Sequence, residues 1–272
     1  MTAETRRLTL NAAAGPVEGY LCRVHASDGN YGTGFGYDPT TAHEMAILDA
    51  EARSEGLPLV EVLGGEAGTV QSAFRVHDRS KHGGLREARG VLSEGYTMIR
   101  VPAESAGIAS ISSLDFETIL LDFDERPSER ALEEVRMVTD AEIVVIAPRE
   151  FDADVPVYVK VTSEEELHAL EEADGVALSV QRVGFLDTVI LGRKAREQGL
   201  DVAILTEVES AISVKAAAHI AGALGAEICD LSGHLPLYED LESLGYAPEI
   251  ELTGPGREVR VHHDPYELAE AP

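Results

Sequence analysis

Basic side chains are scarce in this sequence. Lysine and arginine together number 22, against 49 aspartates and glutamates, and only four of the 22 are lysines. The formal net charge of −27 excludes a nucleic-acid-binding role, which needs a basic face. Carboxylates spread along the whole chain predict a halophilic, acidic protein adapted to a salty cytoplasm, where screening weakens repulsion between like charges. A surface that repels acidic partners is the alternative interpretation.

Cysteines and long apolar runs are also few. Cys22 and Cys229 lie in different predicted elements and form no CxxC pair, so we interpret them as buried small side chains in a reducing cytosol. No apolar run approaches the roughly 18 residues that a membrane-spanning helix needs. The opening MTAETRRLTLNAAAG lacks the long apolar stretch of a secretory signal. We therefore expect a cytoplasmic protein with no membrane partner.

Strand-like and helix-like segments alternate from about residue 70, and 44% of the chain is hydrophobic, which is enough for a large core. This alternation indicates βα units around a parallel sheet. Eight candidate strands predict a TIM-type (β/α)8 barrel or an incomplete version of one. The predicted strands are near 69–77, 96–102, 118–122, 142–147, 156–161, 176–180, 201–205 and 226–230. The predicted helices are near 83–93, 128–138, 163–172, 185–198, 210–224 and 238–243.

The residues before the barrel follow a different pattern. Residues 5–12 and 17–26 alternate apolar and polar side chains and predict an antiparallel pair of strands. The glycines of SDGNYGTGFGY (27–37) resemble a phosphate-binding loop only loosely, and we interpret them as a tight hairpin with close backbone packing. A helix is expected near 39–55, between Asp38-Pro39 and Gly56. Together these segments predict a small α+β region.

Three segments resemble, in their order along the chain, the mandelate racemase/muconate lactonizing branch of the enolase superfamily. They are AILDAEARSEGLPLVEVLGG (46–65), AAAHIAGALG (216–225) and GPGREVRV (254–261). The DGNYGTG segment (28–34) also resembles the start of the family's capping domain. The resemblance covers most of the chain. It implies a reduced α+β cap over 1–66, an abbreviated (β/α) barrel over 67–250, and a C-terminal segment, 251–272, that packs back on the cap.

Family members bind magnesium through carboxylates at the ends of three barrel strands, and the resemblance places only one of these here. The third strand ends in LLDFDE, which retains a carboxylate at Asp122. Ile146 stands at the family's glutamate position in the fourth strand, and Lys160 stands at its aspartate position in the fifth. Magnesium needs oxygen ligands, which an ammonium group cannot supply. Although the family uses Mg²⁺, no metal site and no other cofactor are therefore expected.

The family's catalytic lysines are replaced as well. Its second strand usually ends in KxK, and here IRVPA supplies Arg100 and Pro102. Its sixth strand usually carries KxxKxGG, and here SVQRVGF supplies Ser179 and Arg182. Arginine does not usefully give up its proton and proline has no ionisable group, so a lysine base of the usual kind is not expected. Arg100 and Arg182 are instead candidates to bind an anionic substrate.

Other charged residues at predicted strand ends complete the candidate site. Lys160 follows the apolar run VPVYV, and we expect its ammonium to form an ion pair, first with Asp122 and second with Glu209, that replaces the positive charge of the lost metal. As a candidate catalytic residue, Lys160 is alternatively a base or Schiff-base nucleophile. Asp122 and Asp230 complete the candidate catalytic set. Glu209 is a candidate substrate contact, although with Ser210 it also suits the capping of the following helix.

Two classes of function stay open. The first is a lyase, isomerase or racemase that acts on a small carboxylate or another anionic metabolite with altered catalytic residues. The second is a catalytically inactive homologue, or pseudoenzyme, that serves as a binding or assembly subunit. A homo-oligomer is expected in either case. His77, at the end of the first barrel strand, suits acid–base chemistry at physiological pH, and a solvated loop histidine is the alternative.

Overall fold

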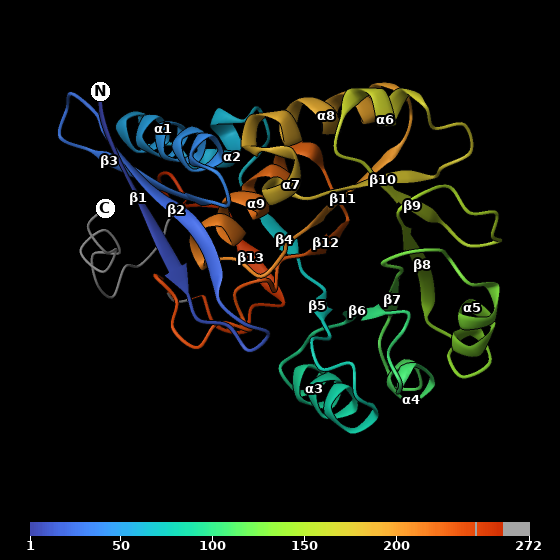
Figure 1. Ribbon diagram of the computed structural model, residues 1–272. Helices are drawn as coiled ribbons and strands as arrows, with labels where there is room; N and C mark the ends of the chain where they lie inside the picture. The colour runs from blue at the N-terminus through green and yellow to red at the C-terminus, as the bar shows by residue number, and fades with distance from the viewer. Residues whose placement is uncertain (243, 258–272) are drawn as a thin grey trace.

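The chain folds into an N-terminal antiparallel sheet with one long helix, followed by a parallel barrel (Figure 1). The computed structural model describes residues 1–242 and 244–257. The arrangement confirms the predicted fold class, a TIM-type barrel with a small α+β capping region. Among the described residues, no helix is both long enough and apolar enough to cross a membrane.

The cap consists of three strands and the helix that packs on them. Its elements are β1 (Thr2–Leu10), β2 (Val17–His25), β3 (Tyr31–Gly36) and α1 (Pro39–Glu55), with the sheet order β1-β2-β3. The Asp38 side chain accepts hydrogen bonds from the first backbone N–H groups of α1, and Gly56 ends the helix at φ 70°. These helix boundaries agree with the predicted ones.

Two glycines of β3 let the strand approach α1 closely. A Cβ atom on Gly32 would lie 2.2 Å from the Ala46 carbonyl oxygen, and one on Gly34 would lie 2.1 Å from that of Ala42. Any larger side chain would push the helix off the sheet. The glycine-rich segment is therefore a packing device, as the interpretation of a hairpin with close backbone contacts expected.

Eight parallel strands form the barrel, and each pairs with its neighbours in the chain. They are β5 (Phe74–Arg75), β6 (Met98–Pro102), β7 (Thr118–Asp122), β8 (Glu142–Ala147), β9 (Val157–Lys160), β10 (Gly175–Leu178), β11 (Asp201–Leu205) and β12 (Ile228–Asp230). A parallel bridge between Ala73 and Asp230 closes the ring, with the Ala73 N–H donating to the Cys229 carbonyl at 2.7 Å. The predicted strand 69–77 is divided in two, because its first part, β4 (Thr69–Gln71), pairs instead with β13 (Glu249–Glu251).

Short helices account for the small size of this barrel. The helices after α1 are α2 (Leu59–Val62), α3 (Lys81–Ser93), α4 (Ile108–Ser112), α5 (Glu129–Arg136), α6 (Glu164–His168), α7 (Val180–Val183), α8 (Phe185–Glu197) and α9 (Ala211–Leu224). Between β6 and β7 the connection has a helix of only five residues, α4, and α6 is equally short. The barrel therefore has all eight strands, and the helices of its outer ring are short.

The prediction of a helix near 238–243 is wrong for residues 238–242, which form no helix. Residue 243 lies outside the described residues. The Asp240 side chain accepts hydrogen bonds from Ser210 Oγ at 2.6 Å and from the Ala211 N–H at 2.8 Å. Glu242 is buried beside Arg257. These tertiary contacts hold the segment against α9 and override its weak helical pattern.

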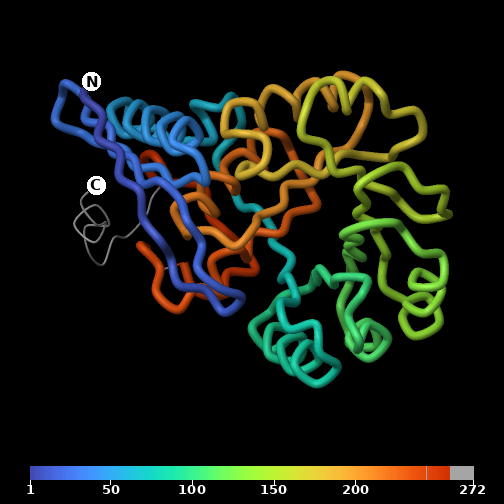
Figure 2. Tube along the Cα trace, in the orientation of Figure 1, coloured from blue at the N-terminus to red at the C-terminus, as the bar shows by residue number. Residues whose placement is uncertain are grey.

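The cap and the end of the described chain lie side by side (Figure 2). The β1–β2 hairpin joins the segment after β12 through an antiparallel bridge between Ala12 and Leu237. Of the C-terminal segment 251–272, only 251–257 lies within the described residues. There the Gly256 N–H donates to the Leu57 carbonyl at 2.8 Å. The division of the chain at residues 66 and 250 stays a prediction.

The barrel interior has an apolar layer below a charged one. Alternate residues of each strand point inward. The inner apolar cluster consists of Ala73, Met98, Leu120, Val144, Ile146, Tyr158, Ala177, Ala203 and Leu205. Arg100, Asp122 and Lys160 each follow a member of this cluster by two positions. Three charged side chains are therefore brought to one level near the carboxyl ends of their strands.

Candidate functional site

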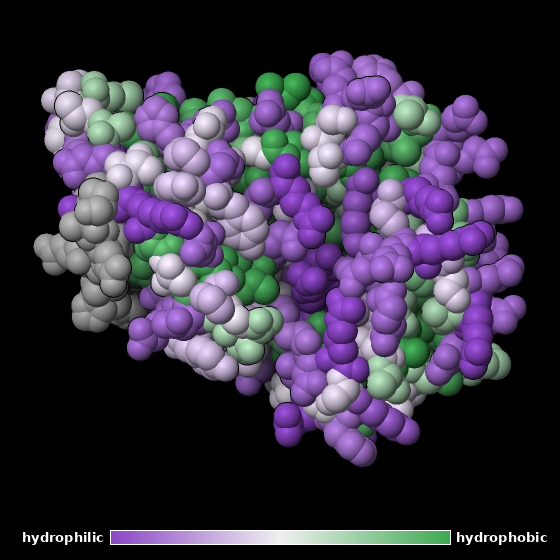
Figure 3. Space-filling model, in the orientation of Figure 1, coloured by the Kyte–Doolittle hydropathy of each residue, from purple (hydrophilic) through white to green (hydrophobic). Residues whose placement is uncertain are grey.

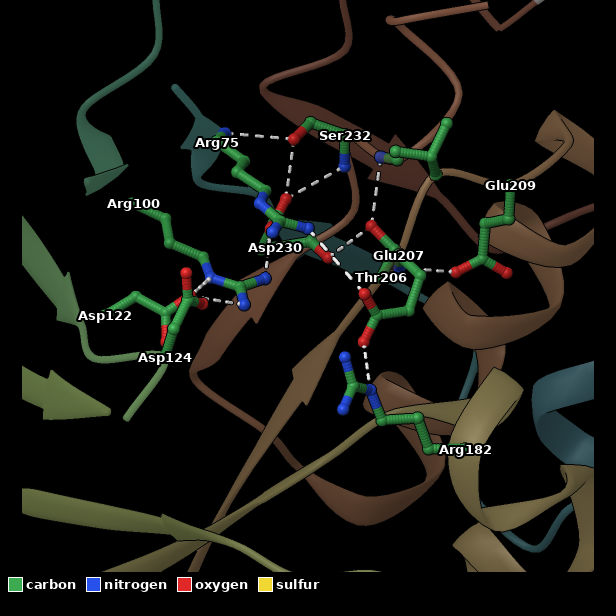
Figure 4. Close-up of polar contacts among 12 residues, drawn as sticks. Arg75, Arg100, Asp122, Asp124, Arg182, Thr206, Glu207, Glu209, Asp230 and Ser232 are labelled. Carbon is green, nitrogen blue, oxygen red and sulfur yellow. Dashed lines mark hydrogen bonds and ion pairs between the residues drawn. The ribbon is translucent and has the colours of Figure 1, made fainter. Parts of the chain in front are cut away.

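Four charged side chains from four barrel strands form one ion-pair network. Figure 4 shows three of them, Arg100, Asp122 and Asp230. Arg100 of β6 lies between two carboxylates. Its Nε and Nη2 atoms donate to Asp122 Oδ2 at 3.0 and 2.7 Å, and its Nη1 donates to Asp230 Oδ2 at 2.7 Å. Lys160 of β9 reaches the same carboxylate, with Nζ 2.6 Å from Asp122 Oδ1. The network links the second, third, fifth and eighth barrel strands, and we call it the barrel network.

The barrel network is largely closed to solvent. The side chains of Arg100 and Asp122 are buried, whereas that of Lys160 is 26% exposed. Burial alone would raise the pKa of Asp122, but Arg100 and Lys160 outweigh it and hold this pKa at about 2. Burial opposes the charge of Arg100, and its two carboxylate partners outweigh that effect and raise its pKa. Asp122 and Arg100 are therefore ionised at neutral pH and neutralise each other.

Backbone and hydroxyl groups provide further hydrogen bonds to Lys160 and Asp230. Lys160 Nζ also donates to the Phe123 carbonyl at 2.9 Å. Asp230 Oδ1 accepts from Ser232, at 2.6 Å from Oγ and 3.1 Å from the backbone N–H. Ser232 Oγ in turn accepts from the Arg75 N–H at 3.0 Å. The prediction that Lys160 pairs first with Asp122 is confirmed, and the loop after β12 holds Asp230 in place.

Arg182 and Glu209 lie near the mouth but outside the barrel network. Arg182 is 63% exposed, and its Nε lies 2.5 Å from Glu207 Oε1. Glu209 is fully buried at the start of α9, where it accepts from Gln181 Nε2 at 2.7 Å and from the Glu207 N–H at 2.9 Å. Burial raises the pKa of Glu209 to about 7. Its contacts place it with Gln181 and the helix start, apart from Lys160.

Two residues of this region, Arg75 and Gln181, were not singled out from the sequence. Arg75 and Glu207 form an ion pair of 3.8 Å across the mouth, and Gln181 joins Glu209 to the cap by accepting from the Tyr37 N–H at 2.8 Å. Arg75 and Gln181 lie at or just beyond strand ends, which is the only sequence signal they carry. Figure 3 shows hydrophilic residues gathered on this face where the cap meets the barrel.

The donor set does not fit the magnesium ion that the family resemblance implies. Both oxygens of Asp122 face cationic groups, those of Arg100 and Lys160. Ile146, at the second ligand position, offers no oxygen and belongs to the apolar layer. Over residues 1–242 and 244–257, no three side chains of His, Cys, Asp or Glu converge as a metal site would require. Arg100 and Lys160 lie next to Asp122, where a metal ion would have to bind, and they neutralise its charge.

Comparison with known proteins identifies the fold but not a close relative. No family model matches the chain, and no curated protein matches it. The L-Ala-D/L-Glu epimerase from Bacillus subtilis superposes with a TM-score of 0.82 at 18% identity, over 95% of this chain and 98% of that one. The N-succinyl Arg/Lys racemase from Bacillus cereus ATCC 14579 gives 0.81 at 16% identity, over 99% and 97%. The mandelate racemase/muconate lactonizing enzyme from Roseiflexus sp. gives 0.80 at 19%, over 96% and 98%.

These likenesses show the fold. The chain has the cap and barrel architecture of the mandelate racemase/muconate lactonizing enzymes, as the sequence resemblance implied. At these identities the likeness carries over the fold and no catalytic group.

Proposed function

We propose that the protein binds a small carboxylate or another anionic metabolite at its barrel mouth without magnesium, as a catalytically inactive relative of isomerase-type enzymes. The barrel network carries this proposal. Arg100, Lys160, Asp122 and Asp230 neutralise one another at the level where a metal and a base would be needed. Two solved structures with this fold are named as an epimerase and a racemase of amino-acid derivatives, which supports a carboxylate as the ligand.

Proton abstraction next to a carboxylate needs a base that can accept a proton and a cation that stabilises the resulting charge. Lys160 directs its ammonium at two acceptors, Asp122 and the Phe123 carbonyl. Arg100 cannot be deprotonated in a protein, and its donors already contact Asp122 and Asp230. The groups on the barrel axis are thus arranged to neutralise charge and not to exchange protons.

A panel of small carboxylates tests this function at constant high salt. Calorimetry measures binding, and proton NMR in D₂O measures exchange of the hydrogen next to the carboxylate. We expect saturable binding without exchange, and the same result with added Mg²⁺ or EDTA. Exchange that appears only with Mg²⁺, or the absence of binding by every carboxylate, contradicts the proposal.

A second candidate, an isomerase or lyase with altered catalytic residues, is favoured by Glu209. A buried carboxyl group with a pKa of about 7 suits the transfer of a proton at neutral pH. In this candidate Lys160, Asp122 and Asp230 keep the catalytic roles suggested by the sequence, and Arg100 and Arg182 bind the substrate. Exchange in D₂O that rises through pH 7 and is lost in Glu209→Gln is expected here, and absence of exchange in the unchanged protein rejects it.

A further inference from the structure

A hollow of about 550 Å³ lies at the edge of the barrel mouth. One side is the β1–β2 turn at Ala13 and Ala14, and the other is the chain that follows β5, from Arg75 to Arg79. Pro102, Val208 and Pro236 add apolar wall. The hollow is therefore off the barrel axis, between the cap hairpin and the end of the first barrel strand.

The cationic groups of this hollow have donors to spare. Arg75 is 17% exposed, and its ion pair with Glu207 is long, at 3.8 Å. Arg79 is 47% exposed and pairs with Asp124 at 2.5 Å and with Glu104 at 4.0 Å. A guanidinium group has five N–H donors, so each arginine can take a further acceptor.

The acidic groups of the hollow are directed at backbone donors. Glu87 Oε2 accepts from the N–H groups of His77 and Asp78, at 2.9 and 3.1 Å. Asp78 Oδ1 accepts from the Ser80 N–H at 2.9 Å. These backbone contacts occupy one oxygen of each carboxylate, and Arg75 and Arg79 are the cationic residues that line the hollow.

His77 adds one hydrogen-bonding atom. Its Nε2 is buried and has no hydrogen-bond partner among the described residues. Burial lowers the pKa of His77 to about 4, so the ring is neutral at physiological pH. In the tautomer that carries its proton on Nδ1, the Nε2 atom accepts a hydrogen bond from a hydroxyl or amide group.

We propose that this off-axis hollow, and not the barrel axis, is the binding site for a small carboxylate that carries a hydrogen-bond donor close to its carboxyl group. Arg75 and Arg79 bind the carboxylate, His77 Nε2 accepts from the donor, and the alanines and prolines cover the rest of the ligand. The proposal rests on the proposed binding function and names its site and ligand class.

Lactate and propionate are suitable probes, because they differ by one hydroxyl group next to the carboxylate. Binding to the full chain is measured by calorimetry at constant ionic strength. We expect lactate to bind more tightly than propionate, and Arg75→Gln and Arg79→Gln each to weaken both by about tenfold or more, equivalent to about 1.4 kcal/mol. His77→Phe should weaken lactate binding more than propionate binding and so remove the preference for lactate. The matched control is Arg136→Gln. It removes a surface arginine of α5 that pairs with Asp154, and it should not change the affinity for either ligand.

The possible results separate this inference from the function on which it rests. If carboxylates bind but neither Arg75→Gln nor Arg79→Gln weakens them, the site lies elsewhere and only this inference is overturned. If no carboxylate binds at all, the proposed function is overturned as well. Arg79 is half-exposed at the surface, so Arg79→Gln is informative even if Arg75→Gln fails to fold.

Discussion

Two buried arginines, Arg100 and Arg257, each lie between two carboxylates, but in different parts of the molecule. Arg100 joins Asp122 and Asp230 inside the barrel at 2.7 Å. Arg257 joins Asp49 of the cap to Glu242 after the barrel, at 3.5 and 3.4 Å, and also donates to Thr33. We call this second group the cap network. The closed sheet holds its ions in good hydrogen-bonding geometry, whereas the cap network joins three separate segments with longer contacts.

The pKa of a carboxyl group in the barrel network, Asp122, is shifted in the opposite direction from that of Glu242 in the cap network. Arg100 and Lys160 overcome the effect of burial on Asp122 and hold its pKa at about 2. Burial dominates at Glu242, and Arg257 only partly offsets it, so the pKa of Glu242 is raised. The two carboxyl groups of the cap network differ: burial would raise the pKa of Asp49, but Arg257, Arg53 and two backbone N–H groups lower it, whereas Glu242 is able to take a proton. In the barrel network two cationic side chains neutralise Asp122 and Asp230, and in the cap network Arg257 links the described end of the chain to the cap.

Arg100→Met is the strongest test of the barrel network. It removes three hydrogen bonds and leaves Asp230 with only Ser232. Breaking a buried pair in this way costs about 3–5 kcal/mol. We expect this loss in the free energy of unfolding, measured with denaturant at constant salt. The exposed Arg136→Met is the control and should change stability by no more than about 0.5 kcal/mol. Equal effects of the two substitutions would contradict the central role of Arg100.

Arg257→Met should lower the free energy of unfolding by less than Arg100→Met does, by about 2–3 kcal/mol. The contacts of Arg257 are longer and Glu242 can be protonated. A raised folded-state pKa gives stability that is present at low pH and lost as pH rises through that value. Since the substitution raises the pKa of Glu242 further, its cost should grow as pH rises through the raised pKa of Glu242 in the folded protein.

The pH profile of Arg100→Met should differ from that of Arg257→Met. The lowered pKa of Asp122 gives stability that is present above its unfolded value and lost only as pH falls towards 2. Removing Arg100 raises the pKa of Asp122 from about 2, so the cost of Arg100→Met should begin to grow at more acidic pH than the cost of Arg257→Met. Parallel pH profiles for the two variants would show that the networks do not differ as proposed.

Lys160→Met should have a smaller effect, about 1–2 kcal/mol, because Lys160 is partly exposed and Arg100 remains beside Asp122. Adding Asp122→Leu should give a double variant that loses less than the sum of the two single losses, since the residues are in contact. Strict additivity in this double-mutant cycle would mean that the 2.6 Å pair has no energetic coupling.

The barrel network could be predicted in part, because strand positions and the inward alternation of side chains follow local, periodic patterns in the sequence. The strands 118–122, 142–147 and 201–205 have the predicted bounds. Inward alternation and a common mouth then place Lys160 near Asp122. What the pattern does not specify is which carboxylate satisfies which cation. Glu209 was the alternative partner for Lys160, but it bonds to Gln181 because the loop after β11 turns into α9 before it reaches the axis.

The cap network could not be predicted in the same way. Arg257 and Asp49 are 208 positions apart, and neither lies at a periodic strand end. Glu242 belongs to a segment whose pattern indicated a helix, and contacts of Asp240 with α9 overrode that pattern. Long-range polar pairs between irregular segments carry no periodic signal, so only the folded chain identifies them.

The smallest expected effect is that of magnesium, and it tests whether Arg100 and Lys160 replace a metal. An ion that binds only the folded state raises the melting temperature by mass action. At constant ionic strength, we expect neither Mg²⁺ nor EDTA to shift the melting temperature of the unchanged protein, because both oxygens of Asp122 face cations. Arg100→Ala/Lys160→Glu removes both cations and directs three carboxyl groups at the same space, so Mg²⁺ should stabilise this double variant. Arg136→Ala should respond like the unchanged protein. A rise in the melting temperature of the unchanged protein with Mg²⁺ would mean that the ion binds despite these two cations, and that Arg100 and Lys160 are only neighbours of a working metal site.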